Sequence, residues 1–269
     1  MKKRKINVKS SISPKEFFLL EKILNAGLPY FEVGNLQKLS GLSREECYKI
    51  IYSLHKKKII KRIEGGKYSV EVFGSYANPL ALASFSVWPS YISFWSALSV
   101  YKFTEQLPET IFIATTKRKQ DIQRKELRVK YVTLSKKRFF GYKFEGTKKE
   151  RIIIAEKEKA LIDSLFLPRH AGGLSETTKA LFNAWSELNQ KKLAGYCLRM
   201  NNKSLNKRLG YLIELLDLKT EPTILKKLQK RIGRGYSKLD STLPKSNEYN
   251  KKWNLIINNK KLLEWREIH

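Results

Sequence analysis

Basic and aromatic side chains gather between residues 43 and 67, and their types suit contacts with nucleic acid. Arg44 has the fork of donors that pairs with the O6 and N7 atoms of guanine, and Lys49 could bind guanine or a phosphate. Glu45 would repel phosphate unless it accepts from a cytosine amine. The complete set of candidate DNA-binding residues is Ser43, Arg44, Glu45, Tyr48, Lys49, Tyr52, Lys56, Lys61, Arg62 and Lys67.

Two helices joined by a glycine turn are predicted to position this set. The sequence Ser43-Arg44-Glu45-Glu46 is a capping box, so a helix is predicted to begin near residue 44. A shorter helix at about 33–39 precedes it, with the turn at 40–42. Ser13-Pro14-Lys15-Glu16 is a second capping box and predicts an earlier helix from about residue 14.

The helix from residue 44 has one apolar stripe, which fixes its outward face. Its stripe follows the i, i+3, i+4, i+7 spacing of a buried helix face and consists of Cys47, Ile50, Ile51 and Leu54. At about 100° per residue, the opposite face is polar and basic. That face consists of Glu45, Lys49, Tyr52 and Lys56, with Arg44 and Tyr48 on its flank.

The residues after this helix predict a β-hairpin. Apolar and polar residues alternate over 59–63 and 68–72, on either side of Gly65-Gly66. A hairpin directly after a helix-turn-helix is a wing, so residues 13–72 are predicted to form a winged helix-turn-helix, within a domain of residues 1–76. Residues 1–70 hold 16 lysines and arginines against 6 acidic residues, which suits phosphate neutralisation. Winged helices also act as protein–protein adaptors, and that alternative stays open.

The whole chain is strongly basic, with a formal net charge of +29 over 269 residues. Such a charge favours polyanionic partners, although a Lys-, Ile- and Asn-rich composition is also typical of AT-rich genomes. The two cysteines, Cys47 and Cys197, predict neither a disulfide framework nor a zinc site. No apolar run reaches the roughly 20 residues of a membrane span. We expect a cytoplasmic protein without a cofactor.

Residues 77–218 predict a larger mixed α/β domain with a small sheet and a helical C-terminal part, so the fold class is α+β. Helices are expected at 80–87, 91–101 and 156–167, and then through 175–217. Strands are expected at 111–114, 129–134, 139–144 and 151–154. Residues 219–269 are expected to form a partly loop-like extension. A possible second basic patch consists of Lys117, Arg118, Lys119, Arg124 and Lys125; a solvated loop and a nucleic-acid contact are equally consistent with it.

An enzymatic function is the main alternative to weigh. Glu156, Glu158 and Asp163 follow a predicted strand, where carboxylates can hold Mg²⁺ in nucleases. The Glu-x-Lys sequence of restriction-type nucleases does not occur in the chain. His170 lies beside Arg169 in a loop, without a nucleophile at a recognisable spacing. We therefore expect no catalytic residues and keep a metal-dependent nuclease as an alternative.

Several blocks in a fixed order resemble the AbiEi family of antitoxins and transcriptional regulators. These blocks are residues 91–98 (YISFWSAL), 107–108 (LP), 111–118 (IFIATTKR), 154–163 (IAEKEKALID), 167–173 (LPRHAGG) and 208–212 (RLGYL). The resemblance covers about 13–218 and leaves out 219–269. It implies a type IV toxin–antitoxin system, in which the winged helix represses its own promoter at inverted repeats in double-stranded DNA. It also implies that the second domain opposes a nucleotidyltransferase-like toxin, usually without forming a stable complex.

Overall fold

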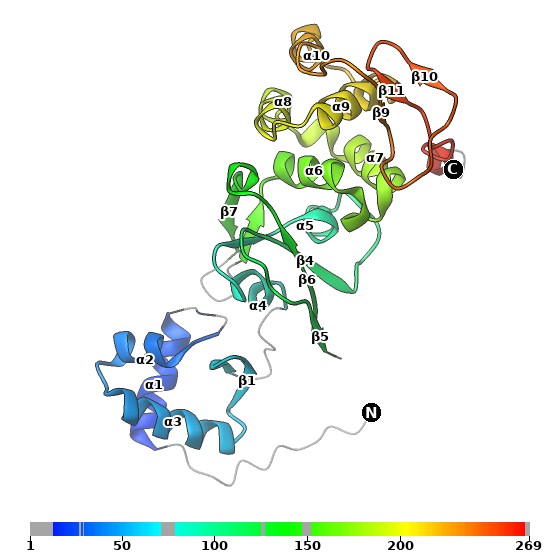
Figure 1. The fold of residues 1–269 in the computed structure, drawn as a ribbon. Helices are drawn as coiled ribbons and strands as arrows, with labels where there is room; N and C mark the ends of the chain where they lie inside the picture. The colour runs from blue at the N-terminus through cyan, green and yellow to red at the C-terminus, as the bar shows by residue number, and fades with distance from the viewer. Residues whose placement is uncertain are drawn as a thin grey trace. The chain divides into compact units, whose positions relative to one another are not determined.

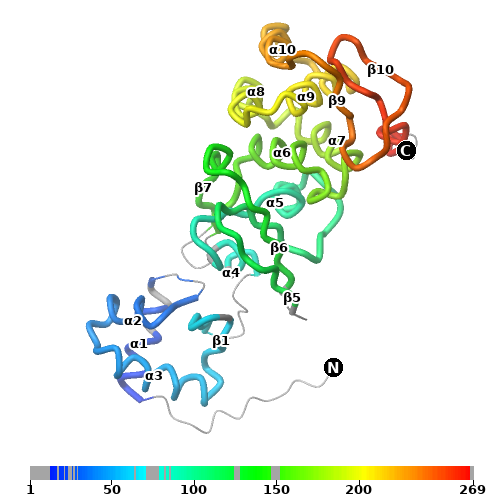
Figure 2. Tube along the Cα trace, viewed as in Figure 1, coloured from blue at the N-terminus to red at the C-terminus, as the bar shows by residue number. Residues whose placement is uncertain are grey.

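The computed structural model describes residues 13–26, 28, 30–70, 79–124, 127–146 and 152–266. Two compact units make up the chain (Figures 1 and 2). The first takes in residues up to 86 together with 144–152, and the second takes in 87–143 and 153–269.

The first unit contains three helices, a hairpin and a short fourth helix. These are α1 (Pro14–Asn25), α2 (Val33–Ser40), α3 (Arg44–Lys56), β1 (Ile60–Glu64), β2 (Lys67–Val70) and α4 (Pro79–Phe85). Both predicted capping boxes are confirmed. The Glu16 carboxylate accepts from the Ser13 amide at 2.6 Å, and the Glu46 carboxylate accepts from the Ser43 amide at 3.1 Å. Gly41 ends α2 in the left-handed conformation that glycine tolerates.

One further residue, Phe31, pairs with the hairpin, and the sequence did not predict this pairing. β1 and β2 pair antiparallel, with Lys61 opposite Ser69 and Arg62 opposite Tyr68. Phe31, between α1 and α2, then exchanges backbone hydrogen bonds with Tyr68 at 2.8 and 2.9 Å. Phe31 is fully buried and stacks on the Tyr68 ring, so this bridge ties the hairpin to the helical core.

A six-stranded mixed sheet has the order β5-β6-β4-β3-β8-β7, and all of it except Phe144–Glu145 of β7 and Ile152 of β8 belongs to the second unit. Its strands are β3 (Ser90–Ile92), β4 (Thr110–Thr115), β5 (Ile122–Arg124), β6 (Leu127–Thr133), β7 (Tyr142–Glu145) and β8 (Ile152–Ala155). β3 and β4 pair antiparallel, whereas β4 and β6 pair parallel. This mixed sheet with accompanying helices confirms the α+β class at the level of the whole chain.

One predicted helix is wrong at its beginning. The sequence predicts a helix over 91–101, but residues 90–92 form β3 and α5 (Phe94–Val100) begins later. β3 pairs with β4 on one side and with β8 on the other, and all three of its residues are buried. The hydrogen bonds of a central strand outweigh the local helical pattern here. β5 was also missed.

Helices follow the sheet in the chain (Figure 1). They are α6 (Lys157–Phe166), α7 (Gly173–Ala184), α8 (Gln190–Arg199), α9 (Lys203–Leu215) and α10 (Pro222–Gln229), with short 3-10 turns at Lys136–Arg138, Pro168–His170, Trp185–Glu187 and Glu264–Arg266. None of the helices among the described residues combines the length and apolar character needed to cross a lipid bilayer.

The C-terminal segment packs on α9. It contains α10 and the strands β9 (Ser237–Lys238), β10 (Tyr249–Asn250) and β11 (Leu255–Ile256), so it holds more regular structure than the sequence suggested. Trp253 is fully buried, and its indole nitrogen donates to Glu214 at 2.8 Å. The indole lies directly on Gly210, where an added Cβ would come within 2.1 Å of the ring.

We predict that Gly210→Ala destabilises the second unit by at least about 2 kcal/mol, because the rigid indole would have to move. Helix propensity alone would predict a gain of up to about 1 kcal/mol. The control is Gly195→Ala in α8, where an added Cβ meets nothing within 4 Å. All five tryptophans lie beyond residue 87, so tryptophan fluorescence in urea reports this unit. Equal stability of the two variants would contradict the packing argument.

Candidate nucleic-acid interface

α3 places its residues as the sequence pattern predicted. Cys47, Ile50, Ile51 and Leu54 are buried, with Ile50 the most exposed of them at 8%. The opposite face is solvent-exposed along its whole length. It consists of Arg44, Glu45, Tyr48, Lys49, Tyr52 and Lys56.

The first turn of α3 shows a division of roles. The Ser43 hydroxyl oxygen accepts from the Glu46 amide at 3.2 Å, so Ser43 begins the helix and orients its first turn. The Arg44 guanidinium lies over the Tyr48 ring, 5.8 Å from its centroid. This cation–π contact holds two exposed side chains together and limits the rotamers of Arg44.

A groove of about 380 Å³ separates α3 from the hairpin. Its lining is aromatic and basic, and it consists of Tyr48, Ile51, Tyr52, His55, Arg62 and Tyr68. Two of these, His55 and Tyr68, were not among the sequence-predicted site residues. His55 directly precedes Lys56, which was predicted. Tyr68 lies opposite Arg62 in the hairpin, so a prediction of the hairpin register would have placed Tyr68 beside this predicted site residue.

The hairpin lysines differ in their surroundings. Lys61 and Arg62 are exposed on β1. The Lys67 ammonium donates to the Ser86 carbonyl at 2.8 Å, lies 4.0 Å from the Glu32 carboxylate and lies 5.0 Å above the Tyr30 ring. These contacts hold the Lys67 side chain against other residues of the first unit.

A buried ion pair connects the beginning of α1 to the end of α3. Glu16 is 3% exposed, and its two carboxylate oxygens accept from the Lys57 ammonium at 2.9 and 2.7 Å. Burial alone would raise the pKa of Glu16, but hydrogen bonds from Lys57, Ser53 and Ser13 outweigh it and lower the pKa to about 2. The ionised carboxylate therefore stabilises the packing that presents α3.

We predict that Glu16→Gln destabilises the first unit by about 2 kcal/mol at neutral pH. Because the folded pKa lies below the unfolded one, the stabilisation is complete above about pH 4.5 and is lost as the pH falls toward about 2. The difference between wild type and variant should narrow over that window. Amide hydrogen exchange of α1 and α3 measures it, with the exposed Glu45→Gln as control. A difference that stays constant with pH would contradict this account.

The second basic patch is described only in part. Lys117 and Arg118 are exposed after β4. Lys119 is half-buried and lies over the Tyr131 ring, 5.2 Å from its centroid. Lys125 and the side chain of Arg124 lie outside the described residues. The three described members therefore do not form one uniformly exposed surface.

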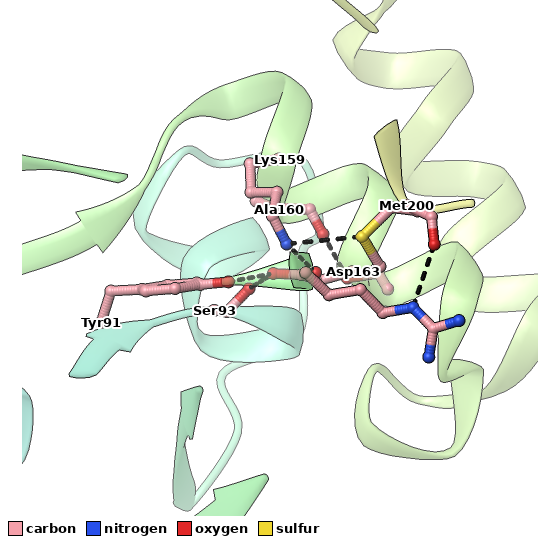
Figure 3. Close-up of polar contacts among 8 residues, drawn as sticks. Tyr91, Ser93, Lys159, Ala160, Asp163 and Met200 are labelled. Atoms are coloured by element: carbon pink, nitrogen blue, oxygen red, sulfur yellow. Dashed lines mark hydrogen bonds and ion pairs between the residues drawn. The ribbon is translucent and has the colours of Figure 1, made fainter. Parts of the chain in front are cut away.

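The acidic residues considered as a metal site are held by hydrogen bonds and ion pairs, and two of them, Glu156 and Glu158, share Lys192. Asp163 is buried in the second unit and accepts from Tyr91 at 3.1 Å, from Ser93 at 2.8 Å and from the Lys159 ammonium (Figure 3). Burial and the adjacent Asp163 raise the pKa of Tyr91 well above its usual value. Lys159 also contacts the Met200 sulfur at 3.9 Å. This cluster is fully buried, and its polar atoms satisfy one another.

The other two carboxylates, Glu156 and Glu158, lie at the start of α6 and have different partners from Asp163. Glu156 accepts from the Tyr196 hydroxyl and pairs with Lys192 at 3.1 Å, while Glu158 accepts from the Asn189 amide at 3.0 Å. Among the described residues, no three His, Cys, Asp or Glu side chains come together in a way that could hold a metal ion.

His170 is buried and packs against two aromatic rings. Its ring lies 5.5 Å from the Phe94 ring and 5.9 Å from the Phe112 ring. Burial and the neighbouring charges of Arg169 and Lys130 lower its pKa to about 4. His170 is therefore neutral at pH 7 and fills space between two aromatic rings.

The fold resembles that of a solved structure. The crystal structure of the RV2827C protein from Mycobacterium tuberculosis superposes with a TM-score of 0.60 and covers 97% of each chain, at 12% sequence identity. At that identity the similarity is one of fold alone. No family model matches the chain, and no curated protein matches it.

Proposed function

We propose that the chain is a sequence-specific DNA-binding transcriptional regulator. The observation that carries this proposal is the exposed face of α3, on which Arg44, Tyr48 and Lys49 follow directly after a capped helix start. The N-terminal part of such a helix is the part that reaches base edges in the major groove. Arg44 would contact guanine, and Lys49 with Tyr52 would bind base or phosphate.

The arrangement of the first unit supports this proposal. We take α2 and α3 as the helix-turn-helix and β1 with β2 as a wing, to which the Phe31 bridge adds a short strand. Lys61 and Arg62 on the wing would bind phosphates beside the groove that α3 enters. Arg62 and three tyrosines line the groove beside α3, and both residue types are also common at protein–protein interfaces. The preference for DNA over a protein partner therefore rests on the basic face of α3 and not on this groove.

The resemblance to the AbiEi family extends the proposal to a particular role. We propose that the regulator represses its own toxin–antitoxin operon at an inverted repeat. In this account the second unit opposes a nucleotidyltransferase-like toxin without forming a stable complex. Support comes from the sequence blocks between 91 and 118, between 154 and 173 and at 208–212. The first group includes residues of the strands β3 and β4, and the last block includes Gly210 of α9, which Trp253 contacts.

We predict that Arg44→Ala/Lys49→Ala reduces the affinity for the chain's own promoter to that for random duplex. Loss of one bidentate base contact costs about 1–3 kcal/mol, which is roughly a 5- to 150-fold change in Kd. Fluorescence anisotropy at fixed salt measures both duplexes. Lys226→Ala/Lys227→Ala on α10 removes the same charge outside the first unit and should retain the preference. Equal binding of wild type to both duplexes would contradict the proposal.

The toxin–antitoxin role makes a separate prediction. If a nucleotidyltransferase-like protein is encoded beside this chain, its expression alone should arrest growth, and co-expression of this chain should restore growth. Arg44→Ala/Lys49→Ala should still restore growth, because the second unit opposes the toxin, while repression of the promoter is lost. If that variant fails to restore growth although it is expressed and folded, the two roles are not divided in this way.

A further inference from the structure

A polar cavity of about 320 Å³ lies in the second unit. It is formed where the turn between α8 and α9 meets the chain after α10. Its lining includes three cations and three side-chain amides: Lys203, Lys230, Arg231, Asn201, Asn202 and Asn206. None of the described residues that line it is acidic. The cavity therefore offers donors and positive charge with no carboxylate to compete.

The positive charge of this cavity is not balanced by ion pairs. Within the described part of the chain, Lys203, Lys230 and Arg231 have no ion-pair partner, whereas many other lysines do. Burial lowers the pKa of the adjacent Lys207, and the Lys203 ammonium lowers it further. Repulsion between neighbouring lysines is the expected result of a positive potential that a bound anion would relieve.

The position of Lys203 is unfavourable without an anion. Lys203 is the first residue of α9, where the helix dipole presents positive charge and the Asn202 side chain accepts from the Leu205 amide at 2.8 Å. A cation at this end is destabilising, in contrast to Lys230 and Arg231, which follow the end of α10 and suit its dipole. An anion beside Lys203 at the start of α9 would make its placement favourable.

The walls of the cavity are fixed by hydrogen bonds. Asn206 is 3% exposed and donates to the Arg231 carbonyl at 3.2 Å, so it ties the chain after α10 to α9. Asn254 donates to the Gly233 carbonyl at 3.2 Å. Gly233 has φ of 68°, and a Cβ there would lie 2.9 Å from the Lys203 side chain. Glycine thus leaves room for the stem of Lys203 along the rim.

We propose that this cavity binds a phosphate ester, with the phosphate held by Lys203, Lys230 and Arg231 and the remainder of the ligand contacted by the side-chain amides of Asn201 and Asn202. The volume lies at the lower end of the range for small-molecule sites and suits a nucleotide. The same chemistry occurs in a free nucleotide and in the backbone of a nucleic acid. The site goes beyond the DNA contact proposed for α3, because it lies in the other unit and requires no base reading.

The test is isothermal titration calorimetry on the full chain, with pyrophosphate, ATP and a random duplex of about 20 base pairs as probes. The duplex is titrated into the Arg44→Ala/Lys49→Ala background, so that base reading by α3 is removed. Lys203→Met/Lys230→Met removes two charges while keeping most of the side-chain volume. Lys226→Met/Lys227→Met, on α10 but outside the cavity lining, is the matched control. Asn201→Asp, at an exposed position, adds one repelling charge and is the second variant.

We expect Lys203→Met/Lys230→Met to weaken binding at least about tenfold, because two charge-assisted contacts are lost. Asn201→Asp should also weaken it, and the control should change it less than about twofold. Binding of ATP or pyrophosphate identifies a free ligand, whereas a site-dependent effect on the duplex alone identifies a nucleic-acid backbone; both support the site. Two results would overturn the proposed site. In the first, Lys203→Met/Lys230→Met leaves the binding of every probe unchanged. In the second, Lys226→Met/Lys227→Met weakens binding as much as Lys203→Met/Lys230→Met does.

Discussion

The buried stripe of α3 is the constraint on which the presentation of the DNA-binding face depends. Burying Cys47, Ile50, Ile51 and Leu54 contributes roughly 2 kcal/mol for each large side chain, which is more than any one exposed contact of α3 could offset. Rotation of the helix by one residue would bury Tyr48 and Tyr52 and expose this stripe. The outward position of Arg44 and Lys49 is therefore a consequence of core packing.

Two further contacts keep that orientation. The Glu16–Lys57 pair joins the first turn of α1 to the end of α3, and its donors hold the carboxylate ionised. The Phe31–Tyr68 bridge joins the segment between α1 and α2 to the hairpin. Both links are long-range in sequence, so α3, the hairpin and the groove between them are positioned by one core.

The sequence predicted α3 well and the sheet less well, for physical reasons. The capping box at Ser43 and the period of the apolar stripe are local signals, and the structure confirms both. Residues 90–92 carry a locally helical pattern, yet they pair with two strands that lie distant in the chain, and this pairing decides their structure. Local patterns cannot report such partners.

The candidate site shows the same division. Helix geometry predicted that Arg44, Tyr48, Lys49 and Tyr52 are exposed. It could not predict the partners of Lys67, because Ser86 and Glu32 are distant from it in sequence. The groove residues His55 and Tyr68 depend on how the hairpin lies against α3. The contact of Trp253 with Gly210 is another between residues distant in sequence, and it joins the C-terminal segment to the rest of the second unit.

The central claim is that the outward face of α3 lies on DNA, and site-specific crosslinking tests it most directly. A photoreactive phenylalanine analogue replaces Tyr52, which is 71% exposed on α3, or Phe182, which is 41% exposed on α7. The account predicts that position 52 crosslinks to bases within the chain's own promoter and that position 182 does not. Crosslinks from position 182 alone, or equal crosslinks from position 52 to promoter and random duplex, would contradict it.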